Sequence, residues 1–547
     1  MAREPEIFTA RRKKTGDGAV SARYKKIAEE KPAQARKQTG GAARKAAAGA
    51  AEKPAAKARE KAAAKPEARG AEKTTAAQRK KTAAPGRGGG KKDGLIDARM
   101  KAGPRSAARR ESGRDRRARE KTEKAMRDRR RAVSRGVDMP VVMITLMTVL
   151  FEAMGFMLLA VRTEGAVDLR AFSLLAVMAP LAIITALVLP RFLPLDPLIM
   201  ALTNFLCGVG MVVLYTVTPE RAVRQASYYA LGLAAMLVVS LAVSRMRRFR
   251  GLTMLSMVLG IGALLLPLAF GSWQNGAKNW VELPFLGSFQ PSELVKLSLV
   301  LSLAYYFSAH RTVLQMMPAL LFAGACLLLL MLQRDLGTAL IYYAATLVLF
   351  YAACGNVPLT IMGLGGGAAA AVLGYRMFAH VKVRVAMWRN PWSDPLDKGY
   401  QIIQALLAIG SGGLFGVGLG QGTPEKIPAY YNDFIFAVIC EQLGVVFGLL
   451  LLAVYLVLIL RGVSLITHTR RSFDMLLGCG VLAIFAIQTF MIVAGVIKMI
   501  PLTGVTMPFL SYGGSSLLSC LMMTGILHGI AARTKADMED DILSIKG

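Results

Sequence analysis

Residues 433–460 read DFIFAVICEQLGVVFGLLLLAVYLVLIL, an apolar run that carries charge only at Asp433 and Glu441. A run of about 20 apolar residues is long enough to cross the hydrocarbon core of a bilayer as a helix. The same pattern recurs from residue 137 onward, and each run ends in a short polar or Gly/Pro break. The sequence therefore predicts an all-α, polytopic membrane helix bundle.

Twelve such runs can be counted along the chain. They begin near Asp138, Ala171, Pro197, Ser227, Leu252, Pro291, Val313, Leu336, Val357, Asp433, Phe473 and Pro508. Lys and Arg beside membrane spans stay on the cytoplasmic side. With the N-terminus inside, twelve crossings place the basic segments at 244–250, 308–312, 461–471 and 531–535 inside as well. We therefore expect a multi-pass protein of the bacterial cytoplasmic membrane with both termini in the cytoplasm.

The first 136 residues have a different composition. They hold 42 of the 68 Lys and Arg but only 16 of the 35 Asp and Glu, and they contain few large apolar side chains. Such a segment cannot bury enough surface to offset its ordering entropy, which predicts a disordered basic cytoplasmic tail. Because it lacks interleaved aromatics and any nucleic-acid-binding module, we expect it to contact an anionic membrane surface and no specific nucleic acid.

Several common site types are not indicated. The six cysteines lie in apolar stretches without CxxC spacing, so neither a disulfide framework nor a zinc site is predicted. Phosphate-loop, HExxH and GxSxG signatures are absent. The glycines of GLGGGA at 363–368 lie within an apolar run, where close helix packing by small residues is favoured over dinucleotide binding.

Three connections fall on the outer face in this topology: 271–290, a long loop at about 380–430, and 500–507. Long loops in compact proteins are usually functional. This one gathers cations around Asp394 and Asp397, an arrangement that suits an anionic substrate and a general base. An Asp before Pro is also a common turn residue. The cations are Lys382, Arg384, Arg389, Lys398 and Lys426.

Glycines recur between 410 and 422 in the same loop. They indicate flexible backbone first, with a phosphate cradle of exposed amides as the alternative. Charges also stand at the starts of two spans, Glu293 with Lys296 and Asp335 beside Arg334. An ionised group is costly in hydrocarbon, so these residues either pair locally or line a cavity.

Six motifs in unbroken order resemble the SEDS (shape, elongation, division, sporulation) family, which includes FtsW and RodA. The resemblance runs from about Asp196 to Ile530. The motifs are NGAKNW, FQPSELVKL, QRDLGTAL, NPWSDPLDKGYQIIQALLAIGSGGLFGVGLG, DFIFAVICEQLG and PLTGVTMPFLSYGGSS.

The resemblance implies a peptidoglycan glycosyltransferase that polymerises lipid II at the outer face of the membrane beside a class B penicillin-binding protein. It assigns the catalytic carboxylate to Asp394, which would deprotonate the acceptor sugar's 4-hydroxyl. Cations would stabilise the departing pyrophosphate, and a divalent cation is a further candidate, although no metal-binding residues are assigned. The expected substrate-binding residues are Lys278, Trp280, Glu293, Lys296, Asp335, Arg384, Lys426, Gln401, Ser511 and Tyr512.

The chain departs from the family pattern in places. PAYYNDFIF stands where PEAHTDFIF is common, QRDLGT where QPDLGT is common, and Ile492 where an Asn is common. The resemblance also implies ten core helices, so the two spans before Asp196 are an addition. We expect a tail at 1–136, two extra helices at 137–195, a SEDS-like core at 196–532 and a cytoplasmic tail at 533–547.

Two other functions compete with polymerisation. A flippase for the lipid-linked precursor would use Glu293, Lys296 and Asp335 as its substrate path. A noncatalytic scaffold of the cell-wall machinery would depend on the basic tail and not on Asp394.

Overall fold

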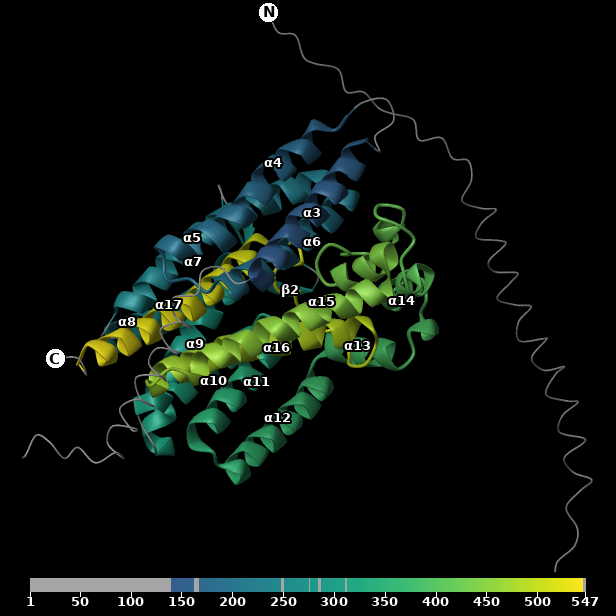
Figure 1. Ribbon diagram of the computed structural model, residues 1–547. Helices are drawn as coiled ribbons and strands as arrows, with labels where there is room; N and C mark the ends of the chain where they lie inside the picture. The colour runs from purple at the N-terminus through teal and green to yellow at the C-terminus, as the bar shows by residue number, and fades with distance from the viewer. Residues whose placement is uncertain are drawn as a thin grey trace, which may run out of the picture. The chain divides into compact units, whose positions relative to one another are not determined.

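The computed structural model describes residues 139–161, 167–246, 250–274, 276–283, 287–309 and 312–544, all within the compact unit Pro104–Gly547. The described residues form a bundle of long helices with one small sheet (Figure 1). The predicted disordered tail at 1–136 lies outside the described residues.

Twelve long helical segments follow one another in the described ranges. They are α3 (Met139–Val161), α4 (Leu169–Ile183) continued by a π-helix η2 (Ile184–Val188) and α5 (Leu189–Phe192), α6 (Pro197–Val217), α7 (Pro219–Arg245), α8 (Arg250–Phe270), α9 (Pro291–Ala309), α10 (Val313–Leu332), α11 (Leu336–Cys354), α12 (Val357–Met377), α15 (Ile435–Thr467), α16 (Ser472–Val496) and α17 (Gly514–Ser544).

Eleven of these segments are long and apolar enough to cross a membrane. The twelfth predicted span is α9, whose sequence includes Glu293, Lys296 and several serines. This helix is nevertheless packed among α8, α16 and α11. The prediction of a multi-pass helical membrane protein is therefore confirmed.

Two helix starts differ from the prediction. α7 begins at Pro219 and not near 227, because Pro favours the first helical turn and the polar stretch ERAVRQ continues the helix beyond the apolar run. α17 begins at Gly514 and not near 508, since the residues before it do not follow a helical path. Phe509 has φ 67° and Gly504 has φ 72°, both in the left-handed region.

The three segments predicted to share the outer face meet at one end of the bundle. Residues 271–290 form an antiparallel sheet of β1 (Ser272–Gln274), β2 (Ala277–Leu283) and β3 (Gly287–Phe289), with Ser272 opposite Trp280 and Val281 opposite Phe289. The long loop folds into α13 (Ala379–Arg389), α14 (Tyr400–Gly412) and the 3-10 helices η3 (Pro391–Ser393) and η4 (Pro424–Lys426).

Two of the basic segments predicted for the inner face, 461–471 and 531–535, carry ion pairs at the other end. Arg461 pairs with Asp196 at 2.6 Å. The buried Arg533 pairs with Asp474 at 2.5 Å and donates to the Met246 carbonyl at 3.1 Å. These contacts join α6, α15, α16 and α17, so the cations at this end also fasten helices together.

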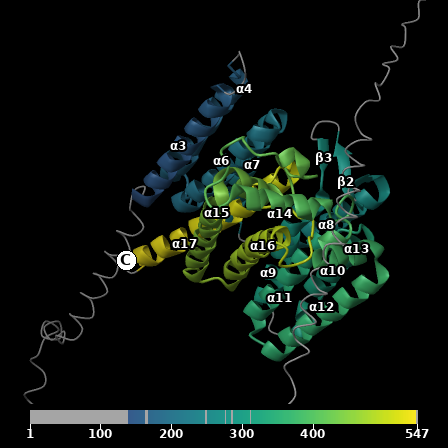
Figure 2. The same cartoon turned by 90° about the vertical axis from the view of Figure 1, so that its right-hand side faces the viewer.

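The first two described helical segments, which begin with α3 and α4, pack at one side of the bundle, and α12 lies at the opposite side (Figures 1 and 2). α3 packs against α4 and α6, where Glu152 is fully buried beside Gly208. In α12, Gly363 and Gly367 approach α11 closely, and Tyr343 donates a hydrogen bond to the Gly363 carbonyl. This close approach agrees with the predicted packing role of the GLGGGA glycines.

A break in α15 anchors the long loop to the bundle. Gly444 has φ 88° and ψ 164°, which interrupts the helical ladder. The strand-like residues after α14 fill this gap: Val417 donates to the Glu441 carbonyl at 2.9 Å, and Val445 donates to the Gly413 carbonyl at 3.0 Å. An opened backbone inside a membrane helix is tolerated because other protein groups satisfy its polar atoms.

We predict that Gly444→Ala destabilises the protein by about 2–4 kcal/mol, because a left-handed alanine is strained and its Cβ would overlap the backbone of Leu414 and Phe415. Thermal unfolding in detergent would measure the loss. Gly324→Ala in α10 is the matched control, since a Cβ there meets nothing within 4 Å. Equal melting temperatures for the two variants would contradict the anchoring role of Gly444.

Candidate functional site

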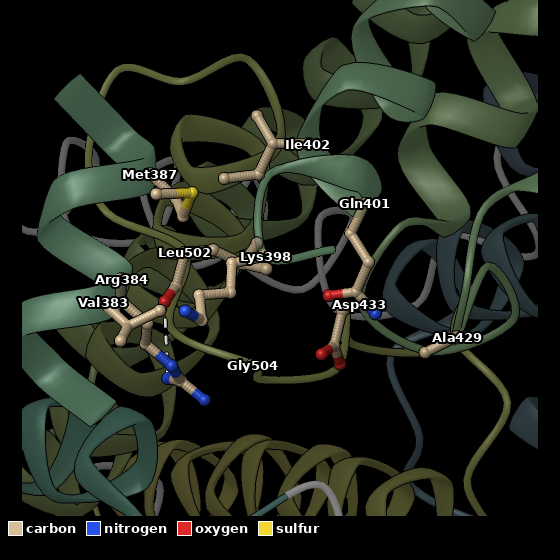
Figure 3. A pocket seen from close by; sticks show the side chains of 10 residues that line it. All are labelled: Val383, Arg384, Met387, Lys398, Gln401, Ile402, Ala429, Asp433, Leu502 and Gly504. Atoms are coloured by element: carbon tan, nitrogen blue, oxygen red, sulfur yellow. Dashed lines mark hydrogen bonds between the residues drawn. The ribbon is translucent and has the colours of Figure 1, made fainter. Parts of the chain in front are cut away.

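A pocket of about 280 Å³ lies between the long loop and the segment before α17 (Figure 3). Its polar lining comes from α13, from the turn before α14, from α14 itself and from the residues just before α15. The lining residues are Val383, Arg384, Met387, Lys398, Gln401, Ile402, Ala429, Asp433, Leu502 and Gly504.

Arg384 is held on one wall of this pocket by backbone carbonyls. Its guanidinium donates to the Thr503 carbonyl at 2.9 Å and to the Leu502 carbonyl at 3.3 Å. One turn later on α13, the Trp388 indole donates to the Lys498 carbonyl at 3.1 Å. A guanidinium that binds neutral carbonyls retains its charge for an anionic ligand.

Asp433 lies on the opposite wall, as Figure 3 shows. The segment that carries it is held by two residues of the SYGG motif. The Ser511 hydroxyl donates to the Asn432 carbonyl at 2.7 Å, and the Tyr512 N–H donates to the Tyr431 carbonyl at 2.8 Å. Burial raises the pKa of Asp433 to about 7, while Arg384 lowers it and Asp335 raises it.

Asp394 sits in the tight turn between η3 and α14, where its carbonyl accepts from the Gly399 N–H at 2.8 Å. About a third of its side chain is exposed, and its Oδ2 lies 3.9 Å from Lys398 Nζ. Lys398 therefore links Asp394 to the pocket, because this lysine lines the pocket itself. Gln401 also lines it, and its amide donates to the Pro428 carbonyl at 3.3 Å.

Asp335 is the centre of a separate hydrogen-bond network at the end of the bundle that carries the small sheet. It caps α11 by accepting from the Thr338 N–H at 3.1 Å. Its other oxygen accepts from Asn279 at 2.8 Å and from Gln290 at 2.9 Å. This carboxylate thus ties β2 and the start of α9 to α11.

Lys278 and Trp280 lie on β2, beside this network. The Lys278 ammonium donates to the Leu268 carbonyl at the end of α8, at 2.7 Å. Both residues are partly buried and neither lines the pocket. Lys426, at the end of η4, is exposed and likewise lies outside the lining set.

Glu293 and Lys296 form a buried ion pair deep among α9, α16 and α17. Lys296 Nζ lies 2.8 Å from Glu293 Oε2 and donates to the Gln488 amide oxygen at 3.1 Å. The Ser519 hydroxyl donates to the same Glu293 oxygen at 3.0 Å. The local pairing that the spacing allowed is therefore present, with two further helices joined to it.

Comparison with known proteins extends over most of the helical part of the chain. A sequence model of FtsW/RodA/SpoVE, described as cell cycle protein, matches residues 197–536. The chain belongs to the FtsW/RodA/SpoVE family. This confirms the resemblance inferred from the six motifs.

Individual members of the FtsW/RodA/SpoVE family are similar over most of their own length. Peptidoglycan glycosyltransferase RodA of Mycobacterium tuberculosis is 34% identical over 379 residues, 63% of this chain and 80% of that protein. The probable peptidoglycan glycosyltransferase FtsW of Geobacter sulfurreducens is 32% identical over 361 residues, 62% of this chain and 96% of that protein.

A solved structure resembles the same region. It is described as "Structural coordination of polymerization and crosslinking by a peptidoglycan synthase complex". It matches with a TM-score of 0.52 at 25% identity, and the match covers 63% of this chain and 98% of that chain.

The amides of the glycine-rich stretch are used inside this family fold. Gly418 N–H donates to the Gln442 carbonyl at 3.0 Å, Gly420 N–H to the Gln442 side chain at 3.1 Å, and Thr423 N–H to the Glu441 side chain at 3.0 Å. These donors are satisfied by α15, so they are not free to hold a phosphate.

The pocket does not fit a resident metal ion. Within the described ranges no group of three or more His, Cys, Asp or Glu side chains is close enough to hold one. The pocket itself combines one carboxylate, Asp433, with the cations Arg384 and Lys398. We derive no catalytic step from a bound metal.

Asp433 is the pocket residue that sequence reasoning did not select. It stands at the start of the DFIF motif, where an acidic residue before a span is also a common helix start. Two features of the sequence could have indicated Asp433 as a site residue. It lies within a family motif, and no cation stands close to it in the sequence to pair with it. Only the fold brings Arg384 and Gly504 to its side.

We predict that Glu293→Ala lowers the free energy of unfolding by about 3–5 kcal/mol, because it leaves Lys296 buried without its carboxylate. The double variant Glu293→Leu, Lys296→Met should recover most of that loss. Glu220→Ala, which breaks an exposed pair with Arg170, is the control and should cost less than about 1 kcal/mol. Thermal unfolding in detergent checks all three, and a double variant as unstable as the single one would refute a mainly structural role.

Proposed function

We propose that Asp394 is the general base of lipid II polymerisation and that the pocket beside it holds the reacting groups. As a member of a family whose relatives are peptidoglycan glycosyltransferases, the chain is a peptidoglycan glycosyltransferase. The observation that carries the site is a pocket lined by Arg384, Lys398 and Gln401. Asp394 does not line this pocket itself, but its Oδ2 lies 3.9 Å from Lys398 Nζ.

The proposed chemistry follows from these positions. Asp394 accepts the proton of the acceptor sugar's 4-hydroxyl as that oxygen attacks the anomeric carbon of the donor. The bond from this carbon to the lipid pyrophosphate breaks, and the pyrophosphate leaves with its negative charge stabilised by Arg384 and Lys398. One carboxylate is sufficient as base, because pyrophosphate does not need protonation to leave.

Other predicted residues take supporting roles in this proposal. Ser511 and Tyr512 position the segment before α15, and Gln401 reaches the same segment through Pro428. Asp335, Glu293 and Lys296 stabilise the surrounding helices, so the flippase reading, which uses them as a substrate path, receives no support from their contacts.

The setting of the reaction is also part of the proposal. We place the pocket on the outer face of the cytoplasmic membrane, both termini in the cytoplasm and a class B penicillin-binding protein beside the bundle. The likeness to a chain of a complex that polymerises and crosslinks supports the partner. We also propose that the basic tail contacts anionic lipid. The proposed core has ten helices at 196–532, and the two helices at 137–195 are an addition to it.

We predict that Asp394→Ala lowers the rate of lipid II polymerisation at least about a hundredfold, the usual contribution of a general base. The assay uses purified full-length protein with its penicillin-binding partner and labelled lipid II. Asp397→Ala, three residues away, is the matched control and should retain activity, because Asp397 is exposed and, within the described ranges, forms no ion pair with a pocket residue as Asp394 does with Lys398. Wild-type rates for Asp394→Ala would exclude the proposed base, and lipid II flipping that needs Glu293 but not Asp394 would favour a transporter.

We predict a contrast between two cations of the loop. Arg384→Gln should lower kcat by about tenfold or more, because a preorganised charge beside the leaving group is lost. Lys426→Gln should change kcat less than about twofold, since Lys426 is exposed and does not line the pocket. Steady-state polymerisation rates of the two variants show which cation stabilises the leaving pyrophosphate. A larger loss of kcat for Lys426→Gln would contradict the role of Arg384 and would place the pyrophosphate site at η4.

A further inference from the structure

The two charged walls of the pocket face each other across Gly504. A Cβ at Gly504 would lie 3.4 Å from Arg384 Nη2 and 3.5 Å from Asp433 Oδ2. Gly504 also has φ 72°, so any other residue would be strained there as well as filling the gap. The space between the two charged groups is thus kept open by the backbone itself.

Arg384 and Asp433 do not neutralise each other directly. Among the described residues no ion pair or hydrogen bond to the Asp433 carboxylate is recorded, whereas Arg384 is bonded to the Leu502 and Thr503 carbonyls. Partly buried carboxylates normally find a partner in the folded protein. An unpartnered one that lines a pocket is therefore available to a ligand.

The pocket offers two different kinds of contact. Arg384 and Lys398 supply positive charge on one wall, while Asp433 supplies an acceptor of hydrogen bonds on the other. A phosphate would be repelled by Asp433, so an anionic group fits only the cationic wall. A neutral group that donates hydrogen bonds, such as a sugar hydroxyl or an N-acetyl N–H, fits the wall of Asp433.

We propose that ionised Asp433 binds the acceptor saccharide through its hydroxyl or amide donors, opposite the cations that hold the donor pyrophosphate. This inference rests on the proposed glycosyl transfer and adds a substrate-binding residue to it. Asp433 exchanges no proton in the reaction, because the proton of the attacking hydroxyl goes to Asp394. Its role is to hold the acceptor with that hydroxyl directed at the donor.

Asp433 must be ionised to accept these hydrogen bonds, which makes acceptor binding depend on pH. The charged groups that act on it are Arg384 from α13 and Asp335 from the start of α11, and Lys398 from the turn before α14 lines the same pocket. The segment 502–512 contributes no charged side chain. Since burial raises the pKa of Asp433 to about 7, the ionised fraction rises between pH 6 and pH 8.

The test compares polymerisation rates from pH 6 to pH 8 for the full-length protein with its partner, using the wild type, Asp433→Asn, Asp433→Glu and Asp397→Asn. The wild-type rate should rise with pH. Asp433→Asn should be about tenfold slower at pH 8 but only about twofold slower at pH 6, because the wild type is then largely protonated. Asp433→Glu should keep a rise with pH, and Asp397→Asn should follow the wild type.

The same variants decide against the inference if Asp433→Asn is slower by one constant factor at every pH, or is as fast as the wild type. Should Asp433→Asn be inactive, binding of fluorescent lipid II replaces the rate: weaker binding than wild type at pH 8 but not at pH 6 supports the role, and equal binding at both refutes it. Activity in Asp394→Ala would instead overturn the proposed function, so the two failures are distinguishable.

Discussion

The irregular segment 502–512 is the element on which both walls of the pocket depend. Its carbonyls at Leu502 and Thr503 hold the Arg384 guanidinium, and Ser511 and Tyr512 hold the backbone just before Asp433. A helix could not do this, because its carbonyls are used in its own ladder. The left-handed residues that break the helical path here therefore release the groups that build the site.

Charges in this protein fall into two classes that differ in whether they have partners. Glu293 with Lys296, and Arg533 with Asp474, are buried ion pairs that join neighbouring helices, so their burial is explained by architecture. Among the described residues Asp433 has no ion-pair or hydrogen-bond partner, and the hydrogen bonds of Arg384 go to neutral carbonyls. Glu152 is also buried without a hydrogen-bond partner, but it does not line the pocket; Asp433 is a candidate functional group because it lines the pocket opposite a cation.

The sequence predicted the helical architecture well, because each span is a long apolar run bounded by Pro, Gly or a charge. It also selected two residues that line the pocket, Gln401 through a family motif and Arg384 as a cation of the long loop. Two features of the structure could not be predicted from the sequence. The docking of the glycine-rich segment on α15 depends on a non-helical Gly444 inside an apolar run, which has no signature in composition. The role of Asp433 depends on tertiary contacts with segments far away in the chain, whereas its immediate neighbours indicate only a helix start.

The most direct measurement is a cryo-EM structure of the full-length chain with its penicillin-binding partner and bound lipid II. Our proposal predicts that the pyrophosphate lies beside Arg384 and Lys398 and that a sugar lies over Gly504 against Asp433. Lipid II seated instead beside Glu293 and Lys296, with the pocket empty, would contradict the proposed site.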